Sequence, residues 1–235
     1  MNGNRQGGMD RADIATGAIE AFIVENLVLT PVPGLPHLTL YTAHPASGLG
    51  RISAQGANRP PYWAYRWAGG MALAHHFVRR PEAVRGLSVL DLGAGSGLVG
   101  IAAVRAGATK VIAADVDPHA GAAIALNAAA NGVTLHFREG DLTASEPPAV
   151  DLVAVGDLFY DAGLAERVMR FLDRCLERGI RVLVGDPGRA HLPRTRLLPI
   201  AEYSVADVGF APSSPPLPAW VFSLQPGSDA NSCFR

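Results

Sequence analysis

The fold of this chain is decided by the stretch Val89-Leu90-Asp91-Leu92-Gly93-Ala94-Gly95-Ser96-Gly97-Leu98. A short apolar run ends at an acid, three glycines alternate with small residues, and an apolar helical pattern starts at Leu98. Glycines let a chain turn sharply and let a ligand approach the backbone closely. The stretch therefore predicts a strand, a tight turn and a helix, with a ligand site at the turn.

Downstream of this stretch, apolar runs alternate with helical patterns. After the strand at 89–91 we expect strands at 111–114, 133–137, 151–155 and 180–184, and helices at 98–106, 119–130 and 164–177. Strands separated by helices pair in parallel through right-handed crossovers. The runs 200–205 and 219–224 have no helical pattern between them, so they are expected to pair antiparallel. The predicted fold class is α/β: a Rossmann-like seven-strand sheet, mostly parallel, with an antiparallel C-terminal edge and helices on both faces.

Upstream, the pattern is less regular. Residues 12–29 have helical apolar spacing that ends at 30–34, residues 37–42 alternate like a short strand, 43–61 resemble a loop, and 62–78 predict a helix. We therefore expect an N-terminal extension, residues 1–86, that packs on a ligand-binding core, residues 87–235.

Composition limits the kinds of partner. The 235 residues carry a formal net charge of −1, so no general basic field argues for nucleic acid or an anionic membrane. The first residues are polar and Gly-rich, and no apolar run is long enough to span a bilayer. Cys175 and Cys233 lack metal-ligand or disulfide spacing, and His75, His76 and His191 have no partner at metal-ligand spacing. We expect a cytoplasmic protein, a monomer, with no metal and no nucleic-acid or membrane partner.

Acids after three successive strands indicate the kind of ligand. The loop also fits the dinucleotide pattern G-x-G-x-x-G. However, Asp91 would repel a pyrophosphate by several kcal/mol if poorly screened, whereas it can bond the ammonium group of an amino-acid ligand. Asp115 follows the next strand and can accept both hydroxyls of a ribose. Asp141 follows the third strand and can accept from an adenine amine. An adenosine that carries an amino acid satisfies all three.

The spacing of these acids resembles that of class I S-adenosylmethionine methyltransferases. The segment 61–70, with its W-x-x-x-W-x-G-G pattern, resembles the segment that packs along the methionine end of the cofactor in this group, although core packing also explains its tryptophans. The resemblance implies S-adenosylmethionine as cofactor and S-adenosylhomocysteine as product. The residues that it assigns to the cofactor are Trp63, Trp67, Asp91, Gly93, Ala94, Gly95, Gly97, Asp115, Val116, Asp141, Leu142 and Asp157.

The acceptor site is expected after the fourth strand, at Asp157-Leu158-Phe159-Tyr160. This segment resembles the D-x-x-Y element of the seven-strand protein-lysine methyltransferases and lacks the proline pair of glutamine-directed relatives. Asp157 would hold and steer the incoming ammonium, and Tyr160 would form a wall of the lysine channel. A simple helix cap by an Asp in this loop is the competing explanation.

Two segments together narrow the resemblance. Gly156 to Asp161 and Gly185-Asp186-Pro187-Gly188-Arg189 are similar to the electron transfer flavoprotein beta subunit lysine methyltransferase family, including its bacterial members. An Asp-Pro-Gly turn explains the second segment equally well. The resemblance implies a protein substrate framed by the region before Leu87 and the loop 209–218. The alternatives are a methyltransferase of a ribosomal protein, a dinucleotide-dependent oxidoreductase and a non-catalytic cofactor-binding module.

Overall fold

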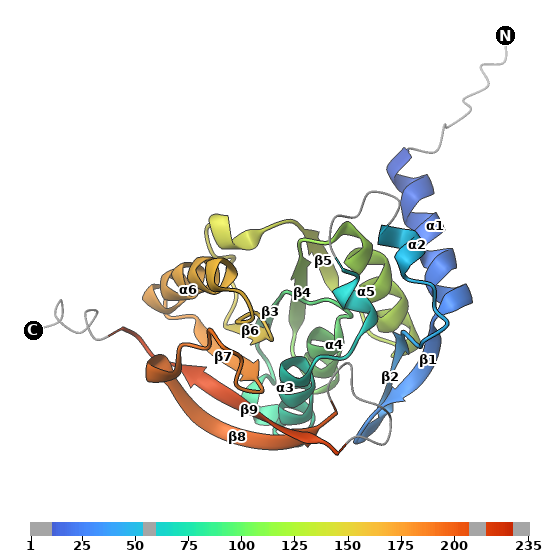
Figure 1. Ribbon diagram of the computed structural model, residues 1–235. Coiled ribbons are helices and arrows are strands. Elements are labelled where there is room, and N and C mark those ends of the chain that lie inside the picture. The colour runs from blue at the N-terminus through green and yellow to red at the C-terminus, as the bar shows by residue number, and fades with distance from the viewer. Residues whose placement is uncertain (1–10, 54–59, 207–214, 228–235) are drawn as a thin grey trace, which may run out of the picture.

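The computed structural model describes residues 11–53, 60–206 and 215–227, with side chains from residue 17 onward (Figure 1). Seven strands form one sheet in the order β5-β4-β3-β6-β7-β9-β8. Its parallel strands are β3 (Ser88–Leu92), β4 (Lys110–Asp115), β5 (His136–Glu139), β6 (Leu152–Gly156) and β7 (Arg181–Asp186). β8 (Leu197–Val205) and β9 (Leu217–Leu224) continue it antiparallel beyond β7. The predicted fold class and antiparallel C-terminal edge are confirmed.

Helices cover both faces of the sheet. α3 (Ala68–Arg79), α4 (Leu98–Arg105) and α5 (Pro118–Ala130) lie on one face, and α6 (Ala162–Glu177) lies on the other (Figure 1). Alternate residues of β3 show why: Val89 packs in the cluster under α3 and α4, and Leu90 packs in the cluster under α6. Since both faces are buried, the central strands are nearly continuous apolar runs.

The strand order reverses between β3 and β6. From β3 the chain proceeds outward through β4 and β5, and then returns to place β6 on the other side of β3. In open α/β sheets, ligands bind beyond the carboxyl ends of the strands at such a reversal. Both the glycine stretch and the segment that begins at Asp157 follow these two strand ends.

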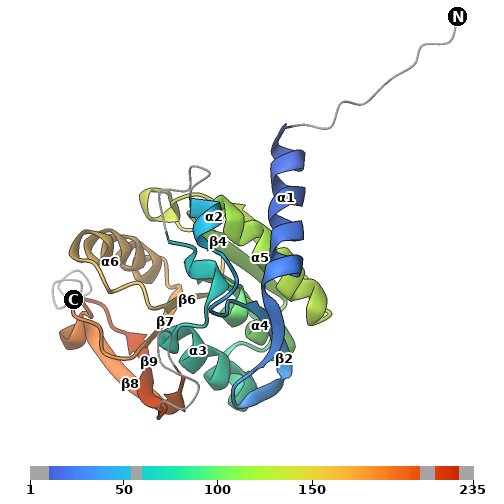
Figure 2. The same ribbon diagram turned by 45° about the vertical axis from the view of Figure 1, so that its right-hand side comes forward.

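The start of the N-terminal region differs from the prediction. Helix α1 (Arg11–Asn26) ends before Leu29, and β1 (Val28–Val32) pairs antiparallel with β2 (Leu35–Thr42). The predicted helix to Leu29 was wrong at its end, because pairing of an alternating, β-branched segment with β2 outweighs a helical spacing that continues through it. α1 lies beside α5 (Figure 2). No helix of the described residues is long and apolar enough to cross a membrane.

The segment predicted as one helix at 62–78 is two. A 3-10 turn, η1 (Tyr62–Ala64), is followed by extended backbone at Tyr65 and Trp67 before α3 begins. α3 belongs to the predicted N-terminal extension and packs against β6, β7, β8 and β9. The division of the chain at residue 87 stays a prediction. Short helical turns complete the described elements: α2 (Gly50–Ser53), η2 (Pro81–Ala83), η3 (Leu142–Ala144) and η4 (Arg194–Arg196).

Candidate active site

The glycine-rich turn after β3 has the backbone conformation that its sequence predicts. Gly93, Gly95 and Gly97 have φ values of 73°, 51° and 80°, in the left-handed region that favours glycine. The amides of Gly93 and Ala94 donate to the carbonyl of Ala114, at 2.9 and 3.0 Å, which attaches the turn to the end of β4. The turn is therefore a rigid cradle rather than a loose loop.

Asp115, at the end of β4, is bonded to this turn. Its carboxylate accepts from the amide of Gly95 at 2.8 Å and from the amide of Asp117 at 2.9 Å. Burial raises the pKa of Asp115, and these amide donors oppose the rise. The next residue, Val116, is exposed. An anchored carboxylate beside a glycine cradle fits the ribose role that the sequence predicts for Asp115.

Two further carboxylates cap helices that lack a side-chain cap of their own. Asp91 in β3 accepts from the amide of Gly100 in α4 at 2.9 Å, and Asp157 accepts from the amide of Gly70 in α3 at 2.9 Å. The residues at the N-caps, Gly97 and Trp67, make no such bond. Negative charge at a helix N-terminus is favourable, because the first amides are unpaired and the helix dipole is positive there.

Burial perturbs both of these acids. It raises the pKa of Asp91 to about 7 and that of Asp157 to about 6, although the amide donors act in the opposite direction. Buried carboxylates with strongly shifted pKa values in a cleft are typical of functional sites, and structural networks produce them too. Here the two acids that cap α4 and α3 are the same ones that the sequence predicts at the ligand site.

Asp157 occupies a strained backbone position. Among the described residues it is the one non-glycine with positive φ, at 59°, and its amide donates to the carbonyl of Gly185 at 3.1 Å. Strained conformations persist where the surroundings over-determine them, commonly at active sites. The strain turns the carboxylate toward α3 and away from the direction of β6.

The start of α3 touches the ends of β6 and β7 through glycines. A Cβ on Gly69 would lie 2.1 Å from the carbonyl oxygen of Gly185 and 2.7 Å from Asp157 Oδ2. A Cβ on Gly156 would lie 3.0 Å from the amide of Gly70. Only glycine allows this approach, and the approach brings the Gly70 amide within reach of Asp157.

Aromatic side chains gather beside Asp157. The ring of Tyr62 lies edge-on to Trp67 at 5.5 Å and 6.1 Å from Tyr160, measured between centroids. Tyr160 is 49% exposed, and Trp67 donates from Nε1 to the carbonyl of Tyr62 at 3.0 Å. Both predicted residues, Trp67 and Tyr160, thus lie near Asp157, at the surface end of the site.

Arg189 completes this group. From the loop after β7, its Nε and Nη2 both contact Asp157 Oδ1, at 3.0 and 2.5 Å, and its guanidinium lies 5.7 Å from the Trp67 ring centre. Sequence analysis singled out its segment but gave Arg189 no role. Its position three residues beyond the end of β7 was the available signal, because the ends of β6 and β7 are adjacent.

The other predicted residues lie further into the core or at its edge. Trp63 is 2% exposed and packs with Ile19 and Ala94, which supports the packing explanation, yet its indole N–H is buried without a partner. Leu142 is buried under α6, and Asp141 accepts from the amide and hydroxyl of Thr143 at 2.9 and 2.6 Å. Their cofactor roles stay predictions, as does the partner role of the loop 209–218, which lies largely outside the described residues.

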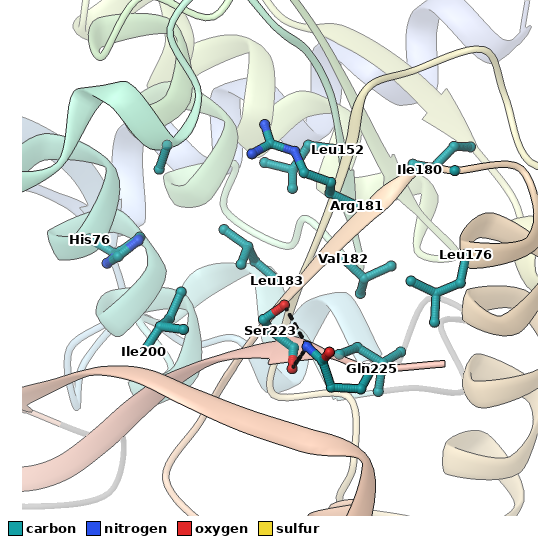
Figure 3. Close-up of a pocket in the computed structure, with 13 residues that line it drawn as sticks. His76, Leu152, Leu176, Ile180, Arg181, Val182, Leu183, Ile200, Ser223 and Gln225 are labelled. Atoms are coloured by element: carbon teal, nitrogen blue, oxygen red, sulfur yellow. Dashed lines mark hydrogen bonds between the residues drawn. The ribbon is translucent and has the colours of Figure 1, made fainter. Parts of the chain in front are cut away.

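A hollow of about 470 Å³ lies elsewhere. Figure 3 shows it lined by His76, Leu152, Ile180, Arg181, Ser223 and Gln225. Leu152 and Arg181 are the first residues of β6 and β7, so the hollow lies at the amino ends of these strands, whereas Asp157 lies at their carboxyl ends. It is therefore separate from the cofactor cradle.

The features of the cradle fit S-adenosylmethionine. A glycine turn with an anchored carboxylate suits an adenosine, and the orphaned Trp63 N–H is a donor that a bound acceptor would satisfy. Within the described ranges, no cluster of three metal-ligating side chains occurs. The fold and the site define a class I S-adenosylmethionine-dependent methyltransferase.

Comparisons with known proteins give the family. A family model described as ribosomal protein L11 methyltransferase matches residues 76–156. The chain is 39% identical over 194 residues to the electron transfer flavoprotein beta subunit lysine methyltransferase of Xenopus laevis, covering 80% of this chain and 79% of that protein. Its identity to the human protein of the same name is 36% over 216 residues, 88% of this chain and 82% of that one.

This protein therefore belongs to the electron transfer flavoprotein beta subunit lysine methyltransferase family, and it is an S-adenosylmethionine-dependent protein-lysine methyltransferase. The predicted family and enzyme class are confirmed. A solved structure of a candidate RNA methyltransferase from Pyrococcus horikoshii aligns at TM-score 0.54 and 18% identity, over 71% of this chain and 90% of that one. That likeness concerns the fold alone.

Proposed function

We propose that this enzyme methylates one or more lysines of the electron transfer flavoprotein beta subunit. The observation that carries the proposal is the 39% identity, over four fifths of the chain, to a relative named for that substrate. The proposed partner is thus a protein, with no nucleic acid or membrane. The proposed enzyme is a cytoplasmic monomer, and the buried thiol of Cys175 suits a reducing compartment.

We assign the cofactor to the glycine cradle. Gly93 to Gly97 would enclose it, Asp115 would accept the ribose hydroxyls, and Asp141 with Leu142 would border the adenine. Asp91 and the tryptophans would border the methionine end. When bound, S-adenosylmethionine supplies a methyl group on a sulfonium and leaves as the neutral thioether S-adenosylhomocysteine.

In this proposal Asp157 receives the substrate lysine. A free lysine has a pKa of about 10.4, so only about 0.1% is neutral near pH 7.4. A carboxylate beside the ammonium favours its charged form, so Asp157 would capture and align the side chain rather than deprotonate it. The ammonium proton would pass to solvent water, and the nitrogen lone pair would then form the bond to the methyl carbon as the carbon–sulfur bond breaks. Tyr62, Trp67 and Tyr160 would enclose the aliphatic stem.

The test is methyl transfer from labelled S-adenosylmethionine to the recombinant beta subunit, with the modified residues mapped by mass spectrometry. We expect label on lysines of the beta subunit and none with the Asp157→Asn enzyme. A second candidate, ribosomal protein L11, follows from the family model that matches residues 76–156. Label on ribosomal protein L11 with an unlabelled beta subunit would overturn the proposed substrate and favour this alternative.

A further inference from the structure

The carboxylate that we assign to substrate capture is already paired with a cation of the same chain. Arg189 contacts Asp157 Oδ1 with two nitrogens, at 3.0 and 2.5 Å, while the Gly70 amide donates a hydrogen bond to Oδ2. The Asp157 side chain is 9% exposed and that of Arg189 is 21% exposed. Arg189 is therefore the more exposed partner and covers the carboxylate.

The loop holds Arg189 in this place by its backbone. Asp186 Oδ1 accepts from the amides of Gly188 and Arg189, both at 2.7 Å, and Gly188 has a φ of 102° that favours glycine. The turn is thus fixed from its inner side, and it directs the Arg189 side chain back toward the end of β6. Asp186 itself is fully buried, so this anchor is shielded from solvent.

Asp157 does not need Arg189 to hold its position. Its side chain is bonded to the start of α3, and its backbone amide is bonded to Gly185. An arginine that served only to hold Asp157 in place would add little, because these two bonds already fix Asp157. What Arg189 adds is a positive charge at the carboxylate, next to the face of Trp67 at 5.7 Å. Carboxylate and aromatic face together make a binding place for an organic cation.

We propose that Arg189 is an internal competitor for the substrate lysine, and that a docking protein must displace its guanidinium from Asp157 before the lysine ammonium can bind there. The inference rests on the proposed function, in which Asp157 receives that ammonium. Arg189 thereby acts as a specificity-determining residue: a small amine pays the full cost of displacement, whereas a protein offsets it with contacts made elsewhere. Apparent affinity falls by the fraction of enzyme in which the site is open.

The displacement does not require the loop to unfold. The Arg189 side chain is 21% exposed, so its guanidinium can turn toward solvent and leave both Asp157 and the ring of Trp67 to the lysine. The backbone bonds to Asp186 do not involve the side chain and can persist. The site can therefore open by movement of the Arg189 side chain, with the backbone of the loop in place.

The first experiment uses Arg189→Met in the full-length enzyme, because methionine keeps an unbranched apolar stem over Trp67 and removes the charge. Arg194→Met is the control: Arg194 donates to the Gly188 carbonyl of the same loop at 3.0 Å and does not bond Asp157. Burial raises the pKa of Asp157, Arg189 and the Gly70 amide lower it, and Asp186 raises it, so removal of Arg189 raises this pKa further. KM is therefore measured at increasing pH until it no longer changes, so that Asp157 is charged in each variant.

For Arg189→Met we expect KM for n-butylamine or a lysine peptide to fall by about tenfold, equivalent to about 1.4 kcal/mol, with kcat retained. Arg194→Met should keep the wild-type KM. If KM in Arg189→Met is unchanged or higher while the affinity for the cofactor is intact, Arg189 does not compete with the substrate amine and the inference is wrong.

The second experiment observes the pair itself, without catalysis. In a nitrogen-15 spectrum, the Arg189 Nε–H signal is assigned by its loss in Arg189→Met. We expect n-butylammonium chloride to shift this signal more than sodium chloride at equal concentration does. Equal shifts from the two salts contradict the inference. If the beta subunit stays unlabelled while this shift occurs, the substrate proposal fails and the Arg189 competition stands.

Discussion

A methyl group on Gly69 tests whether the close approach of α3 to the sheet builds the site. The Cβ of Gly69→Ala would lie 2.1 Å from the carbonyl oxygen of Gly185, where the contact is between a helix and a strand backbone. No side-chain rotation relieves it. The start of α3 must move outward, and the bond from the Gly70 amide to Asp157 must lengthen.

The size of the effect follows from three contributions. Alanine in place of glycine inside a helix gains about 0.5–1 kcal/mol. Overpacking at a rigid contact costs about 1–3 kcal/mol. Loss of a hydrogen bond to a charged group costs about 1.5–3 kcal/mol. The free energy of unfolding should therefore fall by about 1.5–5.5 kcal/mol, and methyl transfer should fall with it because Asp157 loses its anchor.

Gly17→Ala is the matched control. Gly17 lies in α1, and a Cβ there would meet nothing within 4 Å. This variant should be more stable by about 0.5–1 kcal/mol, with unchanged activity. Urea unfolding gives both free energies, and labelled methyl transfer gives both rates. If Gly69→Ala proves as stable and active as Gly17→Ala, the close-approach argument is refuted.

Three further predictions concern other parts of the site. Asp115→Ala should weaken S-adenosylmethionine binding by about 1–3 kcal/mol in calorimetry, through lost hydrogen bonds to a charged group; unchanged affinity excludes the ribose role. Asn127 is fully buried, donates to the Ser96 carbonyl at 2.9 Å and accepts from the Tyr41 amide at 2.8 Å, so Asn127→Ala should lower the unfolding free energy by about 2–4 kcal/mol in urea; a loss well below that range would mean that water replaces both partners. Burial raises the pKa of Asp157 to about 6, and its charged form is the one that binds ammonium, so kcat/KM should fall as pH drops through this value by more than protonation of the lysine alone explains; an acid limb far from this value would belong to another group.

The parallel part of the fold could be predicted because its signals are local. Between residues 89 and 184, β3, β4, β6 and β7 are short apolar runs, each helix has its own spacing, and the glycines at 93, 95 and 97 adopt the positive φ that their type allows. β5 is the exception: it is mostly polar and lies at 136–139 rather than at the expected 133–137. The hairpin of β1 and β2 was partly missed for the opposite reason. The helical spacing at 12–29 does produce a helix over most of its length, but the last residues form β1 because they pair with β2.

Long-range partners explain what remained hidden in the site. Sequence shows that Asp91 lies near the end of an apolar strand and that Asp157 follows one, but it does not show which helix start each one faces. Gly70 lies 87 residues before Asp157, and Arg189 lies 32 residues after it. Such pairs depend on the order of strands and on glycines that let the elements touch. Asp91, Asp115 and Asp157 thus lie at the carboxyl ends of adjacent strands, as their sequence positions indicate, while their bonding partners required the structure.

The dual use of Asp157 determines how it should be mutated. Its carboxylate caps α3, meets Arg189 and, in our proposal, receives the substrate ammonium. Alanine would remove the cap as well as the charge, so a loss of activity in Asp157→Ala has two explanations. Asparagine keeps an oxygen for the Gly70 amide and tolerates positive φ, so it keeps the cap of α3 while it removes the charge and the acceptor for Arg189. If Asp157→Asn keeps the stability and cofactor affinity of the wild type yet fails to methylate, capture by charge and not the cap is what the reaction needs.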